Sequence, residues 1–303
     1  MKIGVALAIA EDDEGRGHRY AELREMAKRA EADGFDSIWV YDHLLYRFRA
    51  DPTRGIWEGW TLLSALAEAT RRVELGTLVL CTAFRNPALL AKMADTLDEV
   101  SGGRLILGLG AGWHRPEFDA FGYPFDHKVD RFEEALKIIV PLLREGRVDF
   151  AGEHYRAVDA ELRPRGPRPS GPPIMIGAAG PRMLRLTAAY ADAWNTCWLG
   201  QPTLLGPRRA ELETACAEVG RDRATLEVTV GVMVAYPDGD DGADRPDPER
   251  QLFGTAEEIA AGLRAYADEG VGHVICACAP HTATSMARLG EALAVYRRAG
   301  AGC

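Results

Sequence analysis

The sequence has no excess of basic residues, no CxxC pair and no apolar run long enough to cross a membrane. Its 45 Asp and Glu residues outnumber its 36 Lys and Arg residues, which gives a formal net charge of −9. Nucleic acid is therefore excluded as the main partner, because binding to phosphate backbones requires a basic face. The apolar opening segment is short and an acidic run follows it, so we expect neither a secretory signal nor contact with a membrane.

The six cysteines lack the spacing of a disulfide framework, so we expect reduced thiols and a cytoplasmic protein. Two histidines and two cysteines near the C-terminus have side chains that can bind metals, but their spacing does not indicate a metal site. His273 and His281 would stand roughly 26 Å apart on an extended strand, at about 3.3 Å per residue, so they cannot share an ion with Cys276 and Cys278. We expect no bound metal.

The chain has the composition of a folded globular protein, with 303 residues, 47% of them hydrophobic and 27% charged. Short β-branched runs alternate with amphipathic stretches along nearly its whole length. Strands are expected at 2–9, 36–41, 73–80, 104–109, 173–177, 192–196, 226–234 and 272–277. Helices are expected at 18–33, 57–70, 87–100, 130–145, 181–191, 202–219, 255–269 and 282–299. Such strand–helix pairs favour a single α/β domain over 1–303, a (β/α)8 TIM barrel, over an open doubly wound sheet.

The excess length over a lean barrel lies in four insertions, at about 43–56, 113–129, 146–172 and 236–254. All but 146–172 directly follow a strand, which places them on the face where such barrels build their active sites. The insertion at 146–172 has the pattern of a small hairpin. The insertion at 236–254 has no apolar anchor, so we expect it to be mobile.

The segment 177–182 joins a strand to a helix and reads Gly-Ala-Ala-Gly-Pro-Arg. Ala178, Ala179 and Gly180 are small enough to let an anion approach the backbone, and Arg182 adds a charged donor. A phosphate site and a simple tight turn are the two interpretations, and late βα turns of barrels often bind phosphate.

The segment 108–113 has three glycines at the exit of a strand and ends in a tryptophan. Its spacing resembles a dinucleotide fingerprint, but no helix is expected to start at the third glycine, as that motif requires. We expect Gly110, Ala111 and Gly112 to let a flat ring lie against the backbone. Trp113 would either stack on a ligand or pack beneath the loop.

Asp42 and His43 follow the second expected strand, so they point into the mouth of a barrel. His43 is the natural proton donor, because its charge state is easily tuned, whereas the alternative is a capping and structural role for both. Cys81 has no base beside it in sequence and is interpreted as a small buried thiol. Trp57 and Glu58 border the first insertion, where Glu58 either favours the helix dipole or lines a substrate pocket.

These motifs together resemble the luciferase-like monooxygenase superfamily, and in particular its branch of oxidoreductases dependent on the deazaflavin coenzyme F420. The resemblance is strong over about residues 1–200 and rests on the order and spacing of several segments. These segments are 34–43, 60–70, 75–79, 87–92, 101–105, 108–113, 131–134, 177–180 and 191–195.

The resemblance implies a barrel that binds a flavin or deazaflavin at its mouth. It places Asp42 and His43 near the ring, and a bulged strand with a non-prolyl cis peptide at Leu78–Val79 behind it. It also implies that Cys81 and 110–112 contact the ring, that 178–182 bind the phosphate, and that 236–254 is a lid. Trp113 replaces a glutamate found in some sugar dehydrogenases of this family, which argues against sugar-phosphate oxidation.

Three functions remain open at this point. The first is hydride transfer between F420 and a small organic substrate. The second is an FMN-dependent monooxygenase that uses dioxygen and is supplied by a separate reductase. The third is a barrel that binds a cofactor without catalysis. The family also makes a homodimer the expected assembly.

Overall fold

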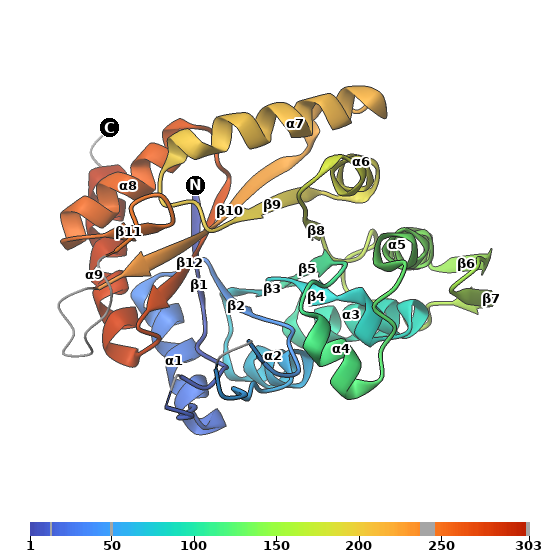
Figure 1. Ribbon diagram of the computed structural model, residues 1–303, viewed down its shortest axis with the longest axis horizontal. Coiled ribbons are helices and arrows are strands. Elements are labelled where there is room, and N and C mark those ends of the chain that lie inside the picture. The colour runs from blue at the N-terminus through green and yellow to red at the C-terminus, as the bar shows by residue number, and fades with distance from the viewer. Residues whose placement is uncertain (13, 49–50, 237–245, 301–303) are drawn as a thin grey trace. The chain divides into compact units, whose positions relative to one another are not determined.

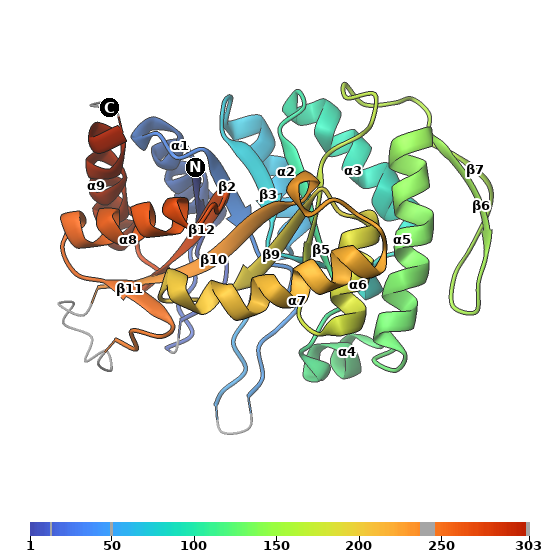
Figure 2. The same cartoon turned by 90° about the horizontal axis from the view of Figure 1, so that it is seen from above.

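The computed structural model describes residues 1–12, 14–48, 51–236 and 246–300 (Figures 1 and 2). The chain divides into two compact units. The first comprises 1–8, 20–39 and the chain from 177 onwards, and the second comprises 9–19 and 40–176. Within the described residues, no helix is both long and apolar enough to cross a membrane.

The first unit is built on parallel strands in the order β2-β1-β12-β10-β9. Their bounds are β2 (Ser37–Val40), β1 (Lys2–Ala6), β12 (His273–Ala279), β10 (Glu227–Ala235) and β9 (Ala193–Cys197). The short β11 (Gln251–Phe253) pairs in parallel with the end of β10. The helices are α1 (Tyr20–Asp33), α6 (Pro181–Tyr190), α7 (Leu205–Glu218), α8 (Ala256–Asp268) and α9 (Ala283–Gly300). The strands read as nearly continuous buried runs, as strands covered on both faces do.

A buried polar trio crosses two strands of the first unit. Trp39 Nε1 donates to Ser37 Oγ over 2.7 Å, and Ser37 Oγ lies 2.8 Å from Nε2 of His273. All three side chains are almost fully buried. Burial lowers the pKa of His273 to about 3, because the imidazolium form would lose its hydration. His273 is therefore a neutral core residue.

The second unit is built on the parallel strands β3 (Glu74–Thr77), β5 (Leu105–Gly110) and β8 (Ile174–Gly177), and the short β4 (Leu80–Cys81) continues β3 along β5. Its helices are α2 (Gly59–Ala69), α3 (Pro87–Ser101), α4 (Arg115–Phe121) and α5 (Lys128–Glu145). The antiparallel hairpin of β6 (Arg147–Ala151) and β7 (Arg156–Glu161) lies beside α5 (Figure 2).

The element order confirms the predicted (β/α)8 class, since each expected strand and helix is present within the described residues. The hairpin predicted in 146–172 is also confirmed. Two elements were not predicted. One is β11, inside 236–254, and the other is α4, inside 113–129, where Pro116 occupies the first helical turn and so does not prevent a helix. We predicted that 236–254 is mobile. Of this segment, 237–245 lie outside the described residues.

Candidate active site

The strand β3 carries an irregularity where the cis peptide was expected. Gly76 pairs with Ile106 and Leu80 pairs with Leu109, so the β3–β4 side has one more residue than β5 between these pairs. The peptide bond between Leu78 and Val79 is cis. Both features, a bulge and a non-prolyl cis bond, are those that the family resemblance implies at this position.

Asp42 is buried directly after β2 and is held from two sides. Its carboxylate accepts the backbone N–H of Cys81 over 2.8 Å and two N–H groups of Arg85 over 2.7 and 2.9 Å. Burial raises the pKa of Asp42, while Arg85 and the Cys81 N–H act in the opposite direction. Because these bonds come from the Arg85 guanidinium and the Cys81 backbone, Asp42 fixes the Arg85 side chain and the start of β4.

Glu58 takes the structural role that the sequence left open. Its carboxylate is the N-cap of α2 and accepts the N–H groups of Trp60 and Thr61. It also pairs with the Arg85 guanidinium, so Arg85 joins Asp42 to Glu58. The neighbouring Trp57 has 47% of its surface exposed and donates its indole N–H to the His18 carbonyl.

His43 is paired with a carboxylate from α4. Its Nδ1–H donates to Glu117, with distances of 2.9 Å to Oε1 and 3.2 Å to Oε2. Glu117 also accepts the Leu44 N–H over 2.8 Å and is 1% exposed. A carboxylate on Nδ1 fixes the tautomer and the ring orientation of the imidazole. Nε2 is the ring nitrogen that remains for proton exchange.

Aromatic rings surround His43. Its ring centroid lies 4.6 Å from that of Tyr46, 5.5 Å from that of Trp113 and 6.4 Å from that of His114. Burial lowers the pKa of His114, whose Nε2 accepts the Arg47 N–H, so His114 is a neutral acceptor at this position. Trp113 remains 57% exposed beside His43. The His43 imidazole thus lies against an accessible apolar surface.

The glycines of β5 and the loop after it are required by the packing of the protein itself. A Cβ on Gly108 would lie 1.8 Å from the Thr77 carbonyl oxygen, and one on Gly110 would lie 2.6 Å from Val79 Cγ2. Gly112 has a φ of +79°, and a Cβ there would meet Phe118 and Cys81. Close packing against the β3–β4 bulge therefore explains glycines that the sequence had linked only to a ring or a nucleotide.

Cys81 is a buried thiol, as the sequence predicts. Its side chain belongs to an apolar cluster with Phe84 and Phe118. Burial raises its pKa to about 12, and the nearby Asp42 carboxylate adds to that effect. A thiol in this state is not a nucleophile at neutral pH.

The turn between β8 and α6 lies in the first unit. Gly180 has a φ of +82° and is the N-cap of α6, Pro181 occupies the first helical position, and no side chain caps the helix. Ala178 donates its N–H to the Asn195 carbonyl, which fixes the turn to β9. Ala179 and Arg182 are exposed.

Sequence reasoning assigned no role to Glu117 or Arg85, the two residues that orient His43 and Asp42. Glu117 lies five residues after Gly112, the last residue of the glycine run, and this proximity was the available signal. No sequence signal pairs Arg85 with Asp42, because 43 residues separate them and only the fold brings them together.

Solved structures of other proteins share the fold class of this chain. A solved F420-dependent secondary alcohol dehydrogenase, in complex with an F420-acetone adduct, is similar to this chain with a TM-score of 0.82 and 23% identity. The match covers 98% of this chain and 99% of that chain. At this identity the likeness establishes the shared (β/α)8 fold alone.

Residues 1–246 match the family model of the luciferase-like monooxygenases, and the chain belongs to that family. An F420-dependent glucose-6-phosphate dehydrogenase of Amycolatopsis mediterranei is 37% identical over 178 residues, which are 57% of this chain and 52% of that protein. The pyrimidine monooxygenase RutA of Stutzerimonas stutzeri is 31% identical over 79% of this chain and 67% of that protein. The chain thus spans about half the length of the first relative and two thirds of the second.

Proposed function

We propose that this protein is an oxidoreductase that transfers a hydride between coenzyme F420 and a small organic substrate. The observation that carries the proposal is the His43–Glu117 pair, a proton donor with a fixed tautomer beside an exposed tryptophan. Similarity to F420-dependent relatives supports the choice of cofactor. When bound, the reduced deazaflavin supplies the hydride, and the protein supplies orientation and the proton.

The residues of the second unit fit a flat, uncharged ring. Val79, Ala111 and Gly112 are partly exposed and carry no charge. We assign them to the surface that a ring would contact, while the buried Leu78, Cys81 and Gly110 hold that surface in place. Asp42 acts through Arg85 and the Cys81 N–H and is a positioning residue.

In the first unit, we assign the anionic chain of the cofactor to 178–180 and Arg182. The first turn of α6 carries no side-chain cap, and the partial positive charge of a helix N-terminus favours an anion. Arg182 adds a fork-shaped donor of the kind that phosphate oxygens bind best.

His43 would exchange its proton through Nε2, since Glu117 occupies Nδ1. Glu117 would hold the imidazolium that forms whenever a proton is taken up from substrate or solvent. Trp113, and more distantly Trp57 and Glu58, would border the substrate. The indole of Trp113 offers apolar contact rather than charge, which favours an uncharged organic substrate over a sugar phosphate.

An FMN-dependent monooxygenase is the second candidate, because RutA is similar over most of this chain. That activity would require dioxygen and a separate flavin reductase as partner. We further propose that 1–303 is a single domain, that the protein works as a homodimer, and that it resides in the cytoplasm. Free cysteines among the described residues agree with a reducing compartment.

Titration of the full chain with reduced F420 and with reduced FMN, without oxygen, tests the proposal. We expect F420 to bind in the micromolar range and more tightly than FMN. Tighter binding of FMN, with oxygen-dependent turnover, would select the second candidate. Failure of both cofactors to bind would refute both candidates.

Two variants test the cofactor-binding and catalytic residues separately. Arg182→Ala should weaken F420 binding by about 1.5–3 kcal/mol, the range for charge-assisted hydrogen bonds. The control is Arg185→Ala, three residues further along α6, which should leave F420 binding unchanged. His43→Asn should retain F420 binding and lose turnover. An unchanged affinity in Arg182→Ala would remove the phosphate assignment from this turn.

A further inference from the structure

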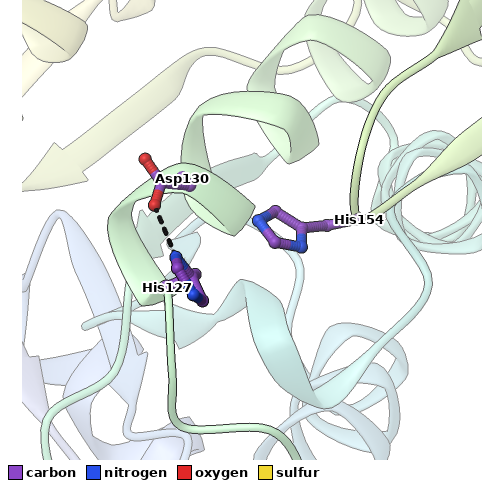
Figure 3. Close-up of side chains that lie close together, drawn as sticks. All are labelled: His127, Asp130 and His154. Carbon is purple, nitrogen blue, oxygen red and sulfur yellow. Dashed lines mark hydrogen bonds and ion pairs between the residues drawn. The ribbon is translucent and has the colours of Figure 1, made fainter.

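Three metal-ligating side chains of the second unit lie together outside the candidate active site. They are His127, Asp130 and His154, and one ligand atom from each lies within 4.8 Å of the others. Figure 3 shows both imidazoles directed toward the space beside the Asp130 carboxylate. They come from two elements, the start of α5 and the tip of the β6–β7 hairpin, so the sequence alone gave no indication of the cluster.

The start of α5 holds two of the donors in one turn. His127 is the N-cap of α5 and has a φ of +51°, a left-handed conformation that histidine adopts more readily than most residues. Asp130 lies three residues further on, and the His127 Nδ1 is 3.2 Å from its Oδ2. The pair has exposed side chains, so both can rotate by the small amount that a shared ligand would require.

The hairpin tip that carries His154 is fixed to α5 by Glu134. One carboxylate accepts the N–H groups of Glu153, His154 and Tyr155 over 2.8, 2.9 and 2.9 Å. The anchor holds the hairpin tip that carries His154 against α5, which reduces the ordering cost of binding a ligand there.

Two imidazole nitrogens and one carboxylate oxygen form the donor set that Zn²⁺ and related divalent transition metals prefer. Mg²⁺ and Ca²⁺ favour sites made entirely of oxygen, so they do not suit this set. We propose that His127, Asp130 and His154 bind one divalent transition-metal ion, with Zn²⁺ as the reference case and the remaining coordination position taken by water.

Such an ion would join the start of α5 to the hairpin tip. The residues next to the metal donors contact the segment 110–112 and the body of α5. Lys128 Nζ donates to the Gly112 carbonyl over 3.4 Å, and the Tyr155 side chain hydrogen-bonds to Arg131. A bound ion would therefore stabilise the segment that supports 110–112 without taking part in the reaction. The metal site does not depend on the proposed activity.

Calorimetric titration of the metal-free full chain with Zn²⁺ tests this site, with Co²⁺ absorption as the report on coordination. We expect one ion per chain. His127→Asn and His154→Gln should each weaken binding by at least about tenfold, since even the loss of an outer-shell partner costs about 10–100-fold. Asn at position 127 keeps a residue that tolerates positive φ, so the variant should fold like the wild type.

The matched control is His18→Gln, which removes a histidine that lies outside the cluster. Its affinity for Zn²⁺ should equal that of the wild type. Glu134→Gln keeps the donors but weakens the anchor, so it should reduce affinity and accelerate amide hydrogen exchange at 153–155. No stoichiometric binding by the wild type, or equal affinity in His154→Gln, would overturn the proposal and leave only a His127–Asp130 ion pair.

Discussion

Oε1 of Glu117 lies 2.9 Å from Nδ1 of His43, although 74 residues separate them in the chain. The pairing depends on α4, which places the buried Glu117 against the segment that follows β2. Because the same carboxylate accepts the Leu44 N–H, it holds both the ring and the backbone beside it. Glu117 is therefore a positioning residue for His43.

Glu117→Gln tests this role. The amide keeps the size of the side chain and one acceptor oxygen but has no charge to stabilise an imidazolium. We expect kcat to fall by about 10²-fold, at the lower end of what general acid–base catalysis contributes, with little change in KM. The measurement is turnover with F420 and the best substrate from a panel of small alcohols and carbonyl compounds.

Asp119→Asn is the control for that variant, because Asp119 lies on the same helix and its side chain is exposed. It should retain wild-type kcat and KM. Full activity in Glu117→Gln would show that His43 does not require a charged partner and would remove Glu117 from the mechanism.

The buried pair of Asp42 and Arg85 should contribute strongly to stability. Asp42→Asn removes one of the two carboxylates that pair with the guanidinium of Arg85 among the described residues, and this side chain is 11% exposed. Loss of one member of a buried pair costs about 3–5 kcal/mol, so we expect a decrease of about 3 kcal/mol in the free energy of unfolding. Urea unfolding followed by circular dichroism measures it. Asp119→Asn, which breaks an exposed pair with Arg115, should change stability by less than about 1 kcal/mol.

Much of the fold was predictable because its signals are local. β-Branched runs, amphipathic stretches and Gly or Pro at element ends identify strands and helices without tertiary information. The prediction failed at α4, where Pro116 was interpreted as an interruption although a proline fits the first turn of a helix. It also failed at β11, whose three residues pair with the end of β10 in a segment of acidic and proline-rich composition.

The candidate site was only half predictable, for a physical reason. Asp42 and His43 are visible in the sequence because they follow a strand, and the strand end places them at the mouth. Their partners Arg85 and Glu117 come from other elements, and no periodicity links residues 43 or 74 positions apart. The bulge and the cis bond at Leu78–Val79 came from family resemblance, since no local propensity indicates either feature.

The buried His273 predicts how stability depends on pH. Its pKa is about 3 in the folded protein and about 6.5 in an unfolded chain, so only the unfolded chain takes up a proton between these values. Stability should therefore fall as pH decreases below about 6.5, by up to about 1.4 kcal/mol per pH unit from this group. Urea unfolding at pH 7.5, 6.5 and 5.5 measures the slope.

His273→Gln isolates that contribution, because every other titrating group is retained. The variant should lose stability less steeply than the wild type below pH 6.5. Parallel curves for His273→Gln and the wild type would mean that His273 is protonated in the folded protein, contrary to its burial beside Ser37.

Alanine substitutions at Gly112 and Gly122 distinguish the stability cost of backbone conformation from that of packing. Both have positive φ, +79° and +77°, so alanine costs about 1–2 kcal/mol at either position. A Cβ on Gly122 meets nothing within 4 Å, but one on Gly112 would lie 2.6 Å from Phe118 Cζ and 2.7 Å from Cys81 Sγ. Gly112→Ala should therefore be less stable than Gly122→Ala by a further 1–3 kcal/mol or so, the usual cost of overpacking.

The contact with the Cys81 sulfur allows the effect of Gly112→Ala to be checked with a double variant. Cys81→Ala creates space beside Gly112, so combining it with Gly112→Ala should relieve part of the clash. The double variant should then be more stable than the sum of the two single effects implies, with a coupling energy above about 0.5 kcal/mol. The Gly122→Ala and Cys81→Ala effects should add without coupling. Equal losses in Gly112→Ala and Gly122→Ala would show that the loop moves away from Phe118, and that its glycine serves backbone conformation alone.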